Sequence, residues 1–213
     1  MRVAIFGATG AIGGHVLEHA GRAEHEVTAM VRDPSRLEVT EHGPSRVLTG
    51  DIAKRDDVHA AIAGAEAVIS ALGPSSNRRE EVDLFEMWAR NVVAAMESHR
   101  VRRLVLLSGA AVALPGERKA LADRVASTVV RLLVRNVVAA KQRELEIVAA
   151  STLDWIAVRP PRVVKGPPTG RWEAGTDLRV GPRSRITRSD LGAFLVSQLT
   201  DDLWIRQAPY VRS

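Results

Sequence analysis

The sequence predicts an α/β protein in which helices cover both faces of a doubly wound parallel sheet. Short, almost wholly apolar runs alternate with segments of helical periodicity along the 213 residues. Strands that are apolar on both sides are typical of a parallel sheet buried between helices. The first such run, Arg2–Phe6, passes into glycines at positions 7, 10 and 13 and then into helix-forming sequence.

The first half of the chain supplies four predicted strands and three predicted helices. Each strand is a short apolar run, and each helix has apolar residues near a spacing of 3.6. The strands are Arg2–Phe6, Glu26–Val31, Arg46–Thr49 and 67–72, and the helices are 11–22, 56–63 and Glu80–His99. This alternation predicts strand–helix–strand units with parallel pairing.

The second half continues the pattern with strands at Arg103–Leu107 and 154–159, the latter stopped by two prolines. Between them, 117–150 is predicted to be helical with a break near residue 135. Residues 162–186 are rich in Gly, Pro and Arg with little periodicity, so we expect a small substrate-covering insertion. A last helix is expected to reach about residue 199, with Thr187 or Ser189 as its cap. The whole chain, 1–213, is predicted to be one domain.

Composition narrows the function classes. With 46% hydrophobic and 26% charged residues, the chain resembles a soluble globular protein. The net charge of +5 comes from scattered arginines without a concentrated basic face, so no nucleic-acid partner is expected. Cysteine is absent, and no apolar run approaches the ~18 residues of a membrane span. No signal peptide is read at the start of the chain, so we expect a cytoplasmic monomer or homodimer that acts on a small molecule.

The glycine-rich turn predicts a phosphate site. Gly7 permits a tight turn, Gly10 lets backbone N–H groups approach a ligand, and Gly13 lets the helix lie close to the sheet. The N-terminus of the following helix then points at a phosphate. An ordinary glycine-containing loop is the alternative. We expect the ligand to contact Gly7, Thr9, Gly10, Ala11, Ile12 and Gly13.

Residues after the second strand bear on the choice of dinucleotide. Arg32 follows the strand directly and Arg36 comes one helical turn later, where guanidinium groups favour a 2′-phosphate. These arginines favour NADP, with NADPH as the preferred form. Asp33 keeps NAD open, because an acidic residue at this point binds ribose hydroxyls.

Two further strand ends are predicted to line the cofactor. Asp51 can accept from the adenine amino group while Ile52 packs on the ring, although Asp51 could instead cap a helix. Ala71, Leu72 and Gly73 are expected next to the pyrophosphate and the nicotinamide ribose.

In order, residues 7–13, 31–36, 50–51, 107–108, 151–160 and 186–192 resemble the atypical short-chain dehydrogenase/reductase group of NmrA-like NAD(P)H-binding proteins. Within that group, the chain is similar to the flavin reductase and biliverdin reductase branch. The resemblance covers nearly the whole chain and implies a Rossmann fold. It also implies NADP(H) on the glycine turn, Arg32 at the 2′-phosphate, and Leu72, Gly73 and Ser108 beside the nicotinamide.

One departure from the wider group concerns the proton donor. Many short-chain dehydrogenases carry a Tyr-x-x-x-Lys pair, but here Val137 stands four residues before Lys141. The only tyrosine, Tyr210, lies near the C-terminus. Valine cannot donate a proton, which disfavours alcohol dehydrogenation and sugar epimerisation by the tyrosine mechanism. Flavin-reductase-like relatives also lack this tyrosine, but they carry a Thr-Ser pair where this chain has Ser108 and a glycine.

The predicted catalytic residues are Ser108 and Lys141. Ser108 follows a central strand and could orient a nicotinamide amide or an acceptor carbonyl, or merely bond the neighbouring backbone. Lys141 could reach cofactor or substrate, or form a surface ion pair with Glu144. Pro161 is also assigned to the cofactor site, and Arg162 and Trp172 to a planar anionic acceptor. His15 and His19 have an i,i+4 spacing but no third ligand, so no metal site is predicted.

These observations favour an NADPH-dependent reductase that passes hydride to a small conjugated acceptor such as a flavin or quinone. One alternative is an NADP(H)-binding redox-sensing regulator without turnover, as in NmrA-like sensors. Another is an epimerase- or dehydratase-like enzyme on an unknown metabolite.

Overall fold

The computed structural model describes residues 1–38, 40–114 and 134–213. Its centre is a six-stranded sheet of order β3-β2-β1-β4-β5-β6, in which every neighbouring pair is parallel. The strands are β1 (Arg2–Phe6), β2 (Glu26–Val31), β3 (Arg46–Thr49), β4 (Ala67–Ser70), β5 (Arg103–Leu107) and β6 (Asp154–Val158). The order reverses between β1 and β4, and ligands of such sheets bind at this reversal. The predicted doubly wound fold is confirmed.

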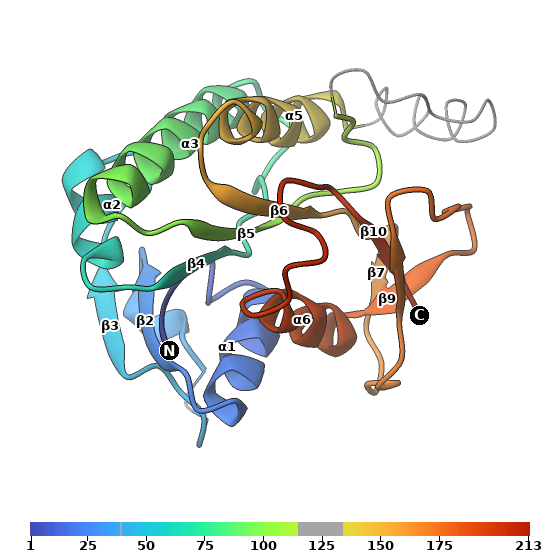
Figure 1. The fold of residues 1–213 in the computed structure, drawn as a ribbon, viewed down its shortest axis with the longest axis horizontal. Helices are drawn as coiled ribbons and strands as arrows, with labels where there is room; N and C mark the ends of the chain where they lie inside the picture. Colours follow the sequence, from blue (N-terminus) through green and yellow to red (C-terminus); the bar gives the residue numbers. More distant parts are fainter. Residues whose placement is uncertain (39, 115–133) are drawn as a thin grey trace.

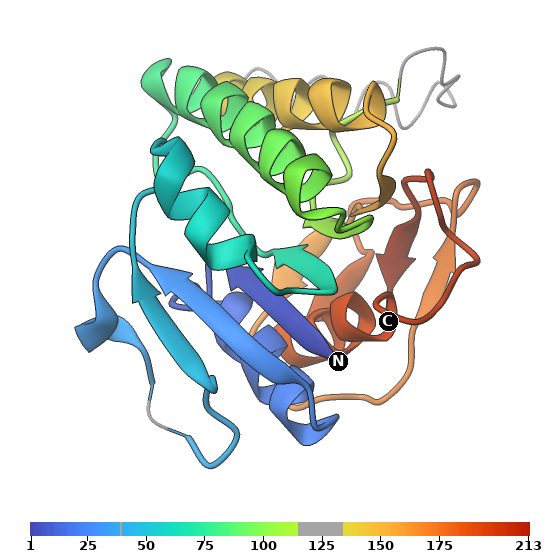
Figure 2. The same ribbon diagram turned by 60° about the vertical axis from the view of Figure 1, so that its left-hand side comes forward.

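Helices cover both faces of the sheet (Figure 1). One layer holds α1 (Gly13–Arg22) and α6 (Arg188–Ser197); the other holds α2 (Arg55–Ile62), α3 (Glu80–His99) and α5 (Arg135–Ala149). Figure 2 shows α2, α3 and α5 lying together above the sheet, with α1 beneath it. A one-turn 3₁₀ helix, η1 (Pro34–Arg36), follows β2.

Each face of the sheet has its own hydrophobic core. The strands β1, β4, β5 and β6 are buried almost throughout, as their apolar sequences require. On the α3 side, Phe6 packs against Trp88 with ring centroids 4.6 Å apart. On the α1 side, Gly192 of α6 lies so close to α1 that a Cβ would come within 2.9 Å of His15. α3 therefore packs directly on β1 of the sheet, and α1 and α6 pack closely against each other.

The segment 162–186 contains more regular structure than its sequence suggests. It forms β7 (Arg162–Val164), β8 (Glu173–Gly175) and β9 (Arg185–Thr187). β7 pairs with β9 in parallel, while β8 pairs antiparallel with β10 (Tyr210–Arg212) at the C-terminus. Strands of three residues are too short to show a period of two, so they could not be predicted from the sequence.

Several element boundaries differ from the expected ones. β4 ends at Ser70 rather than at residue 72, which leaves residues 71–73 in a loop at the sheet edge. α1 begins at Gly13, two residues later than expected. α5 begins where the break near residue 135 was predicted, and 117–133 lies outside the described residues. Of the two candidate caps, Thr187 is the one used: its Oγ1 accepts from the Asp190 N–H at 3.1 Å. Within the described ranges, no helix combines the length and apolarity needed to cross a membrane.

Candidate cofactor and substrate site

The turn between β1 and α1 needs glycine at two positions. Gly7 has φ +85°, and a Cβ there would come within 2.9 Å of the Ala71 backbone. A Cβ on Gly13 would lie 1.9 Å from the Gly7 carbonyl oxygen. The first turn of α1 therefore sits directly on the end of β1, where its N–H groups face the sheet edge that a ligand would occupy.

A cavity of about 200 Å³ lies over this turn. It gathers ten of the predicted cofactor residues from the ends of β1, β2, β3 and β4: Gly7, Thr9, Gly10, Arg32, Arg36, Asp51, Ile52, Ala71, Leu72 and Gly73. The carboxyl ends of parallel strands meet at one edge of a sheet, so these residues converge although they lie far apart in sequence.

The acidic residue after β2 has a role within the turn. The Asp33 carboxylate caps η1, accepting from the Ser35 N–H at 3.0 Å and from its hydroxyl at 2.7 Å. Those hydrogen bonds from Ser35 lower the pKa of Asp33. Arg32 and Arg36, on either side of Asp33, line the cavity. Two arginines therefore line the cavity here, while hydrogen bonds from Ser35 hold the Asp33 carboxylate in the turn.

Asp51 lines the same cavity and also orders its own loop. Its Oδ1 accepts from the Ala53 N–H at 2.9 Å, and its own N–H donates to Asp57 at 2.8 Å. α2 starts later, with Lys54 as its N-cap, so Asp51 does not cap that helix as the alternative interpretation held. Asn91 of α3 donates to the carbonyls of Ile52 and Ala53 and holds this loop against the helix.

One acidic residue of this cavity escaped the sequence analysis. Glu81, in the first turn of α3, is 8% exposed and lines the cavity. It accepts from the Ser75 N–H and hydroxyl and from the Ser76 hydroxyl. Burial acts in the opposite direction, but the hydrogen bonds from Ser75 and Ser76 lower the pKa of Glu81. The only sequence feature that could have indicated this residue is a carboxylate a few residues after two serines at a helix start. The same pattern is typical of ordinary helix capping and therefore does not point to a ligand site.

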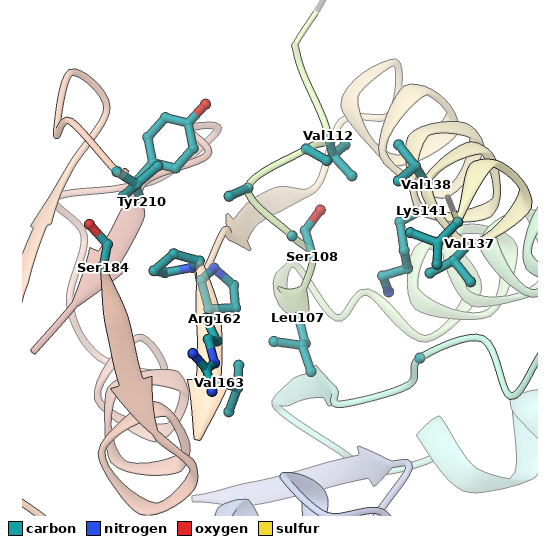
Figure 3. A pocket seen from close by; sticks show the side chains of 18 of the residues that line it. Leu107, Ser108, Val112, Val137, Val138, Lys141, Arg162, Val163, Ser184 and Tyr210 are labelled. Atoms are coloured by element: carbon teal, nitrogen blue, oxygen red, sulfur yellow. The ribbon is translucent and has the colours of Figure 1, made fainter. Parts of the chain in front are cut away.

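A second, larger cavity of about 580 Å³ adjoins the first, and Leu72 and Gly73 line both. Figure 3 shows it from close by: α5 contributes Val137, Val138 and Lys141 on one side, while Arg162, Ser184 and Tyr210 stand on the other. Ile12, Ser108 and Pro161 also line it, as predicted. The remaining lining is mostly aliphatic, which suits an apolar ring system.

The Ser108 side chain contributes a buried hydroxyl group to this cavity. Its backbone N–H continues the sheet by donating to the Val158 carbonyl at 2.8 Å. Its Oγ is buried and has no hydrogen-bond partner within the described parts of the chain. The alternative of a bond to the neighbouring backbone is therefore wrong for the side chain. An unpaired buried hydroxyl is costly, and a ligand atom in the cavity could satisfy it.

Lys141 is not part of a surface ion pair, and that alternative is wrong. Its side chain is 5% exposed, and its Nζ donates to the Leu72 carbonyl at 3.0 Å. It also pairs with Glu144, which is 1% exposed and accepts from Trp88 Nε1 at 2.9 Å. Burial raises the pKa of Glu144, and Lys141 and Trp88 oppose that effect. Val137, the residue in the usual tyrosine position, also lines the cavity.

The C-terminus contributes a residue that sequence reasoning did not place in the site. Tyr210 lies at the start of β10, lines the larger cavity and is 7% exposed. Its ring stacks on the guanidinium of the buried Arg159, 3.9 Å away. Nothing local in the sequence near residue 210 links it to a cavity formed around residue 108.

Three residues that were predicted to contact the cofactor or the acceptor line neither of these two cavities: Ala11, Gly13 and Trp172. Ala11 and Gly13 lie in the turn itself, whereas Trp172 packs edge-on against Phe194 of α6 and is 37% exposed. His19 lies against the Ser189 hydroxyl at 3.1 Å rather than in a ligand cluster. Among the described residues, no group of three or more His, Asp or Glu side chains could hold a metal ion.

A family model of NAD(P)H-binding proteins matches residues 7–202. The chain belongs to this NAD(P)H-binding family. The match begins at Gly7 of the glycine turn, and the motifs that suggested the resemblance fall within it. The family match therefore supports a nicotinamide dinucleotide as the cofactor.

Solved structures of similar fold cover the whole chain. A candidate NAD-dependent epimerase/dehydratase from Bacillus halodurans has 24% identity and a TM-score of 0.82, with 94% of that chain covered. A short-chain dehydrogenase/reductase from Veillonella parvula has 17% identity and a TM-score of 0.80, with 94% covered. ChuY, an anaerobillin reductase from Escherichia coli O157:H7, has 19% identity and a TM-score of 0.79, with 97% covered. At these identities the comparisons establish the fold.

The residues present fit such a dinucleotide. The close approach of Gly13 to Gly7 brings the N-terminus of α1 to the edge of the sheet, where its N–H groups can bind a pyrophosphate. Arg32 and Arg36 supply cations at one end, and the unpaired Ser108 hydroxyl supplies a hydrogen-bonding group at the other. The smaller cavity therefore suits the adenosine half, and the larger cavity suits the nicotinamide with room for a second molecule.

Proposed function

We propose that this family member is an NADPH-dependent reductase that transfers hydride to a small conjugated acceptor, such as a flavin or quinone. The observation that carries the proposal is the larger cavity itself. It adjoins the dinucleotide cavity at Leu72 and Gly73, has a mostly aliphatic lining, and contains the unpaired Ser108 hydroxyl. An apolar slot next to the nicotinamide position favours a flat acceptor stacked on the cofactor.

Seven of the lining residues have a proposed role. Arg32 and Arg36 bind the 2′-phosphate, and Asp51 and Ile52 hold the adenine. Ser108 donates to the nicotinamide amide or the acceptor carbonyl, and Lys141 donates to the nicotinamide ribose. Arg162 neutralises an acidic group on the acceptor, and the segment 162–186 closes the cavity on that side. Bound NADPH would supply the hydride, while the protein supplies position and excludes water.

The choice of NADPH over NADH is supported by the geometry around Asp33. A carboxylate that bound ribose hydroxyls would face the cavity, but the Asp33 oxygen accepts two hydrogen bonds from Ser35 within the turn. The neighbouring Arg32 and Arg36 line the cavity. A dianionic 2′-phosphate matches such a pair through charge-assisted hydrogen bonds.

Val137 favours a second candidate, a redox-sensing NADP(H)-binding regulator without turnover. The residue stands in the cavity where the tyrosine of many short-chain dehydrogenases supplies a proton. Val137 is compatible with the reductase, because a conjugated acceptor can take its proton from water. It is equally compatible with a sensor, because a sensor transfers no proton.

Turnover separates the two candidates. Purified protein is mixed with NADPH and a panel of flavins, quinones and linear tetrapyrroles, and the absorbance at 340 nm is followed. The reductase proposal predicts NADPH oxidation that depends on both acceptor and protein. Tight NADPH binding without oxidation by any acceptor would instead support the regulator.

A further inference from the structure

Lys141 and Glu144 form an ion pair that is buried in the core beside the larger cavity. Lys141 and Glu144 lie one turn apart on α5, and both face the core rather than solvent. Trp88 of α3, which is fully buried, completes the cluster by donating to the Glu144 carboxylate at 2.9 Å. Taking both charges out of water is expensive, and apolar residues of similar size often serve stability equally well. The pair therefore calls for an explanation beyond stability.

The place where the ammonium lies supplies that explanation. Lys141 lines the larger cavity, and its Nζ donates to the carbonyl of Leu72, which lines both cavities. The Nζ also lies 4.9 Å from the centre of the Phe85 ring, and Phe85 lines the smaller cavity. The ammonium is thus at the join of the two cavities, where a dinucleotide must pass from its adenosine half to its nicotinamide half.

Contacts with the described residues leave one donor of the ammonium unused. Of its three N–H groups, the described residues engage one at Leu72 and one at Glu144. Glu144 is the only carboxylate paired with Lys141 in the described ranges. Further charged or titratable side chains line the two cavities: Arg162 and Tyr210 line the larger cavity, and Glu81 lines the smaller one.

We propose that Glu144 is a positioning residue for the cofactor: together with Trp88 it fixes the Lys141 ammonium at the join of the two cavities, with its remaining donor available to NADP(H). The same contacts hold the Leu72 carbonyl, and with it the loop after β4 that both cavities share. Glu144 acts entirely through Lys141. This inference rests on the proposed NADP(H) site and does not depend on hydride transfer.

The test is a double-mutant cycle on NADPH affinity, measured by NADPH fluorescence. Glu144→Gln keeps the shape of the side chain and removes its charge, and burial then disfavours an unpaired ammonium. We expect NADPH to bind about tenfold more weakly, with the loss growing as the pH rises from 6 to 9. In the Lys141→Met background, Glu144→Gln should have no further effect, because the two substitutions disrupt one interaction. Glu146→Gln, two residues along α5 and half in solvent, is the matched control and should change affinity less than twofold.

A second variant separates positioning from folding. Lys141→Met with Glu144→Gln replaces the charged pair by neutral side chains and keeps an amide oxygen that can accept from Trp88 Nε1, so it should be as stable to urea as the wild type. Its NADPH affinity should still fall about tenfold. Wild-type affinity in this variant, or an additive loss in the cycle, would overturn the inference and leave the proposed reductase untouched. Weakened binding supports the inference whether or not the wild type reduces any acceptor.

Discussion

The guanidinium of Arg159 lies 3.9 Å from the centre of the Tyr210 ring, and both side chains are buried behind the larger cavity. Arg159 directly follows β6 and also donates to the carbonyls of Ala208 and Val112 at 2.8 and 3.2 Å. It therefore ties the C-terminal segment and the loop after β5 to the end of β6. Two of the residues it holds, Val112 and Tyr210, line the cavity.

Replacing this arginine should destabilise the protein. Arg159→Lys keeps the charge but loses the planar stacking and the forked hydrogen bonds, so we expect the free energy of unfolding to fall by about 2–4 kcal/mol. Urea denaturation followed by tryptophan fluorescence measures the change. Arg102→Lys is the control, because Arg102 makes a solvent-exposed ion pair with Asp154 that should contribute less than about 1 kcal/mol. Equal losses in the two variants would contradict the buried role.

Cofactor selectivity should depend on Arg32. Arg32→Ala removes a cation from the smaller cavity, and we expect the Kd for NADPH to rise about 10- to 100-fold while that for NADH changes little. Fluorescence titration with each dinucleotide provides the comparison. Arg22→Ala serves as the control, since Arg22 pairs with Glu18 on the surface of α1. Equal losses for both dinucleotides would rule out a contact between Arg32 and the 2′-phosphate.

Ser108 should matter for transfer more than for binding. Ser108→Ala removes the unpaired hydroxyl, and we expect the hydride-transfer rate to fall about tenfold or more because one donor to the reacting pair is lost. The NADPH Kd should stay within about twofold, since most cofactor contacts lie elsewhere. Single-turnover absorbance at 340 nm separates the two quantities, and Ser197→Ala on α6 is the control. An unchanged transfer rate would remove Ser108 from the reaction.

Acid should weaken the contact between α3 and α5. Hydrogen bonds from Arg143 and Arg90 lower the pKa of Glu86 from its ordinary value of 4.5 to about 2. A carboxylate with a lowered pKa stabilises the fold above its unfolded value, and this stabilisation is lost as the pH falls from about 4.5 toward 2. We therefore expect the Tm difference between wild type and Glu86→Gln to be largest near pH 6 and to shrink below pH 4.5. Thermal unfolding by circular dichroism at several pH values checks this, with Glu97→Gln as the control for loss of a charge. A constant difference would show that the ion pairs do not stabilise the fold.

Much of the smaller cavity could be predicted from the sequence because its residues lie at strand ends. Parallel strands place their carboxyl ends at one edge, so Gly7, Arg32, Asp51 and Leu72 could be assigned to one ligand without a structure. Trp172 was assigned to the acceptor from the resemblance and not from a strand end, and it packs on Phe194 without lining either cavity. Glu81 and Tyr210 could not be predicted as cavity residues. Glu81 lies at a helix start and Tyr210 near a chain terminus, and the sequence around them does not indicate that they line a cavity.

The sequence by itself determined the alternation of strands and helices, the glycine turn and the arginines after β2, because each depends on local conformation and on residues close together in the chain. Only the tertiary structure decided which way the side chains of α5 face. Helical spacing placed Lys141 and Glu144 on one side of the helix but could not tell solvent from core. Packing against α3 turned that side inward, so an apparent surface ion pair became a buried one that lies on the join between the two cavities.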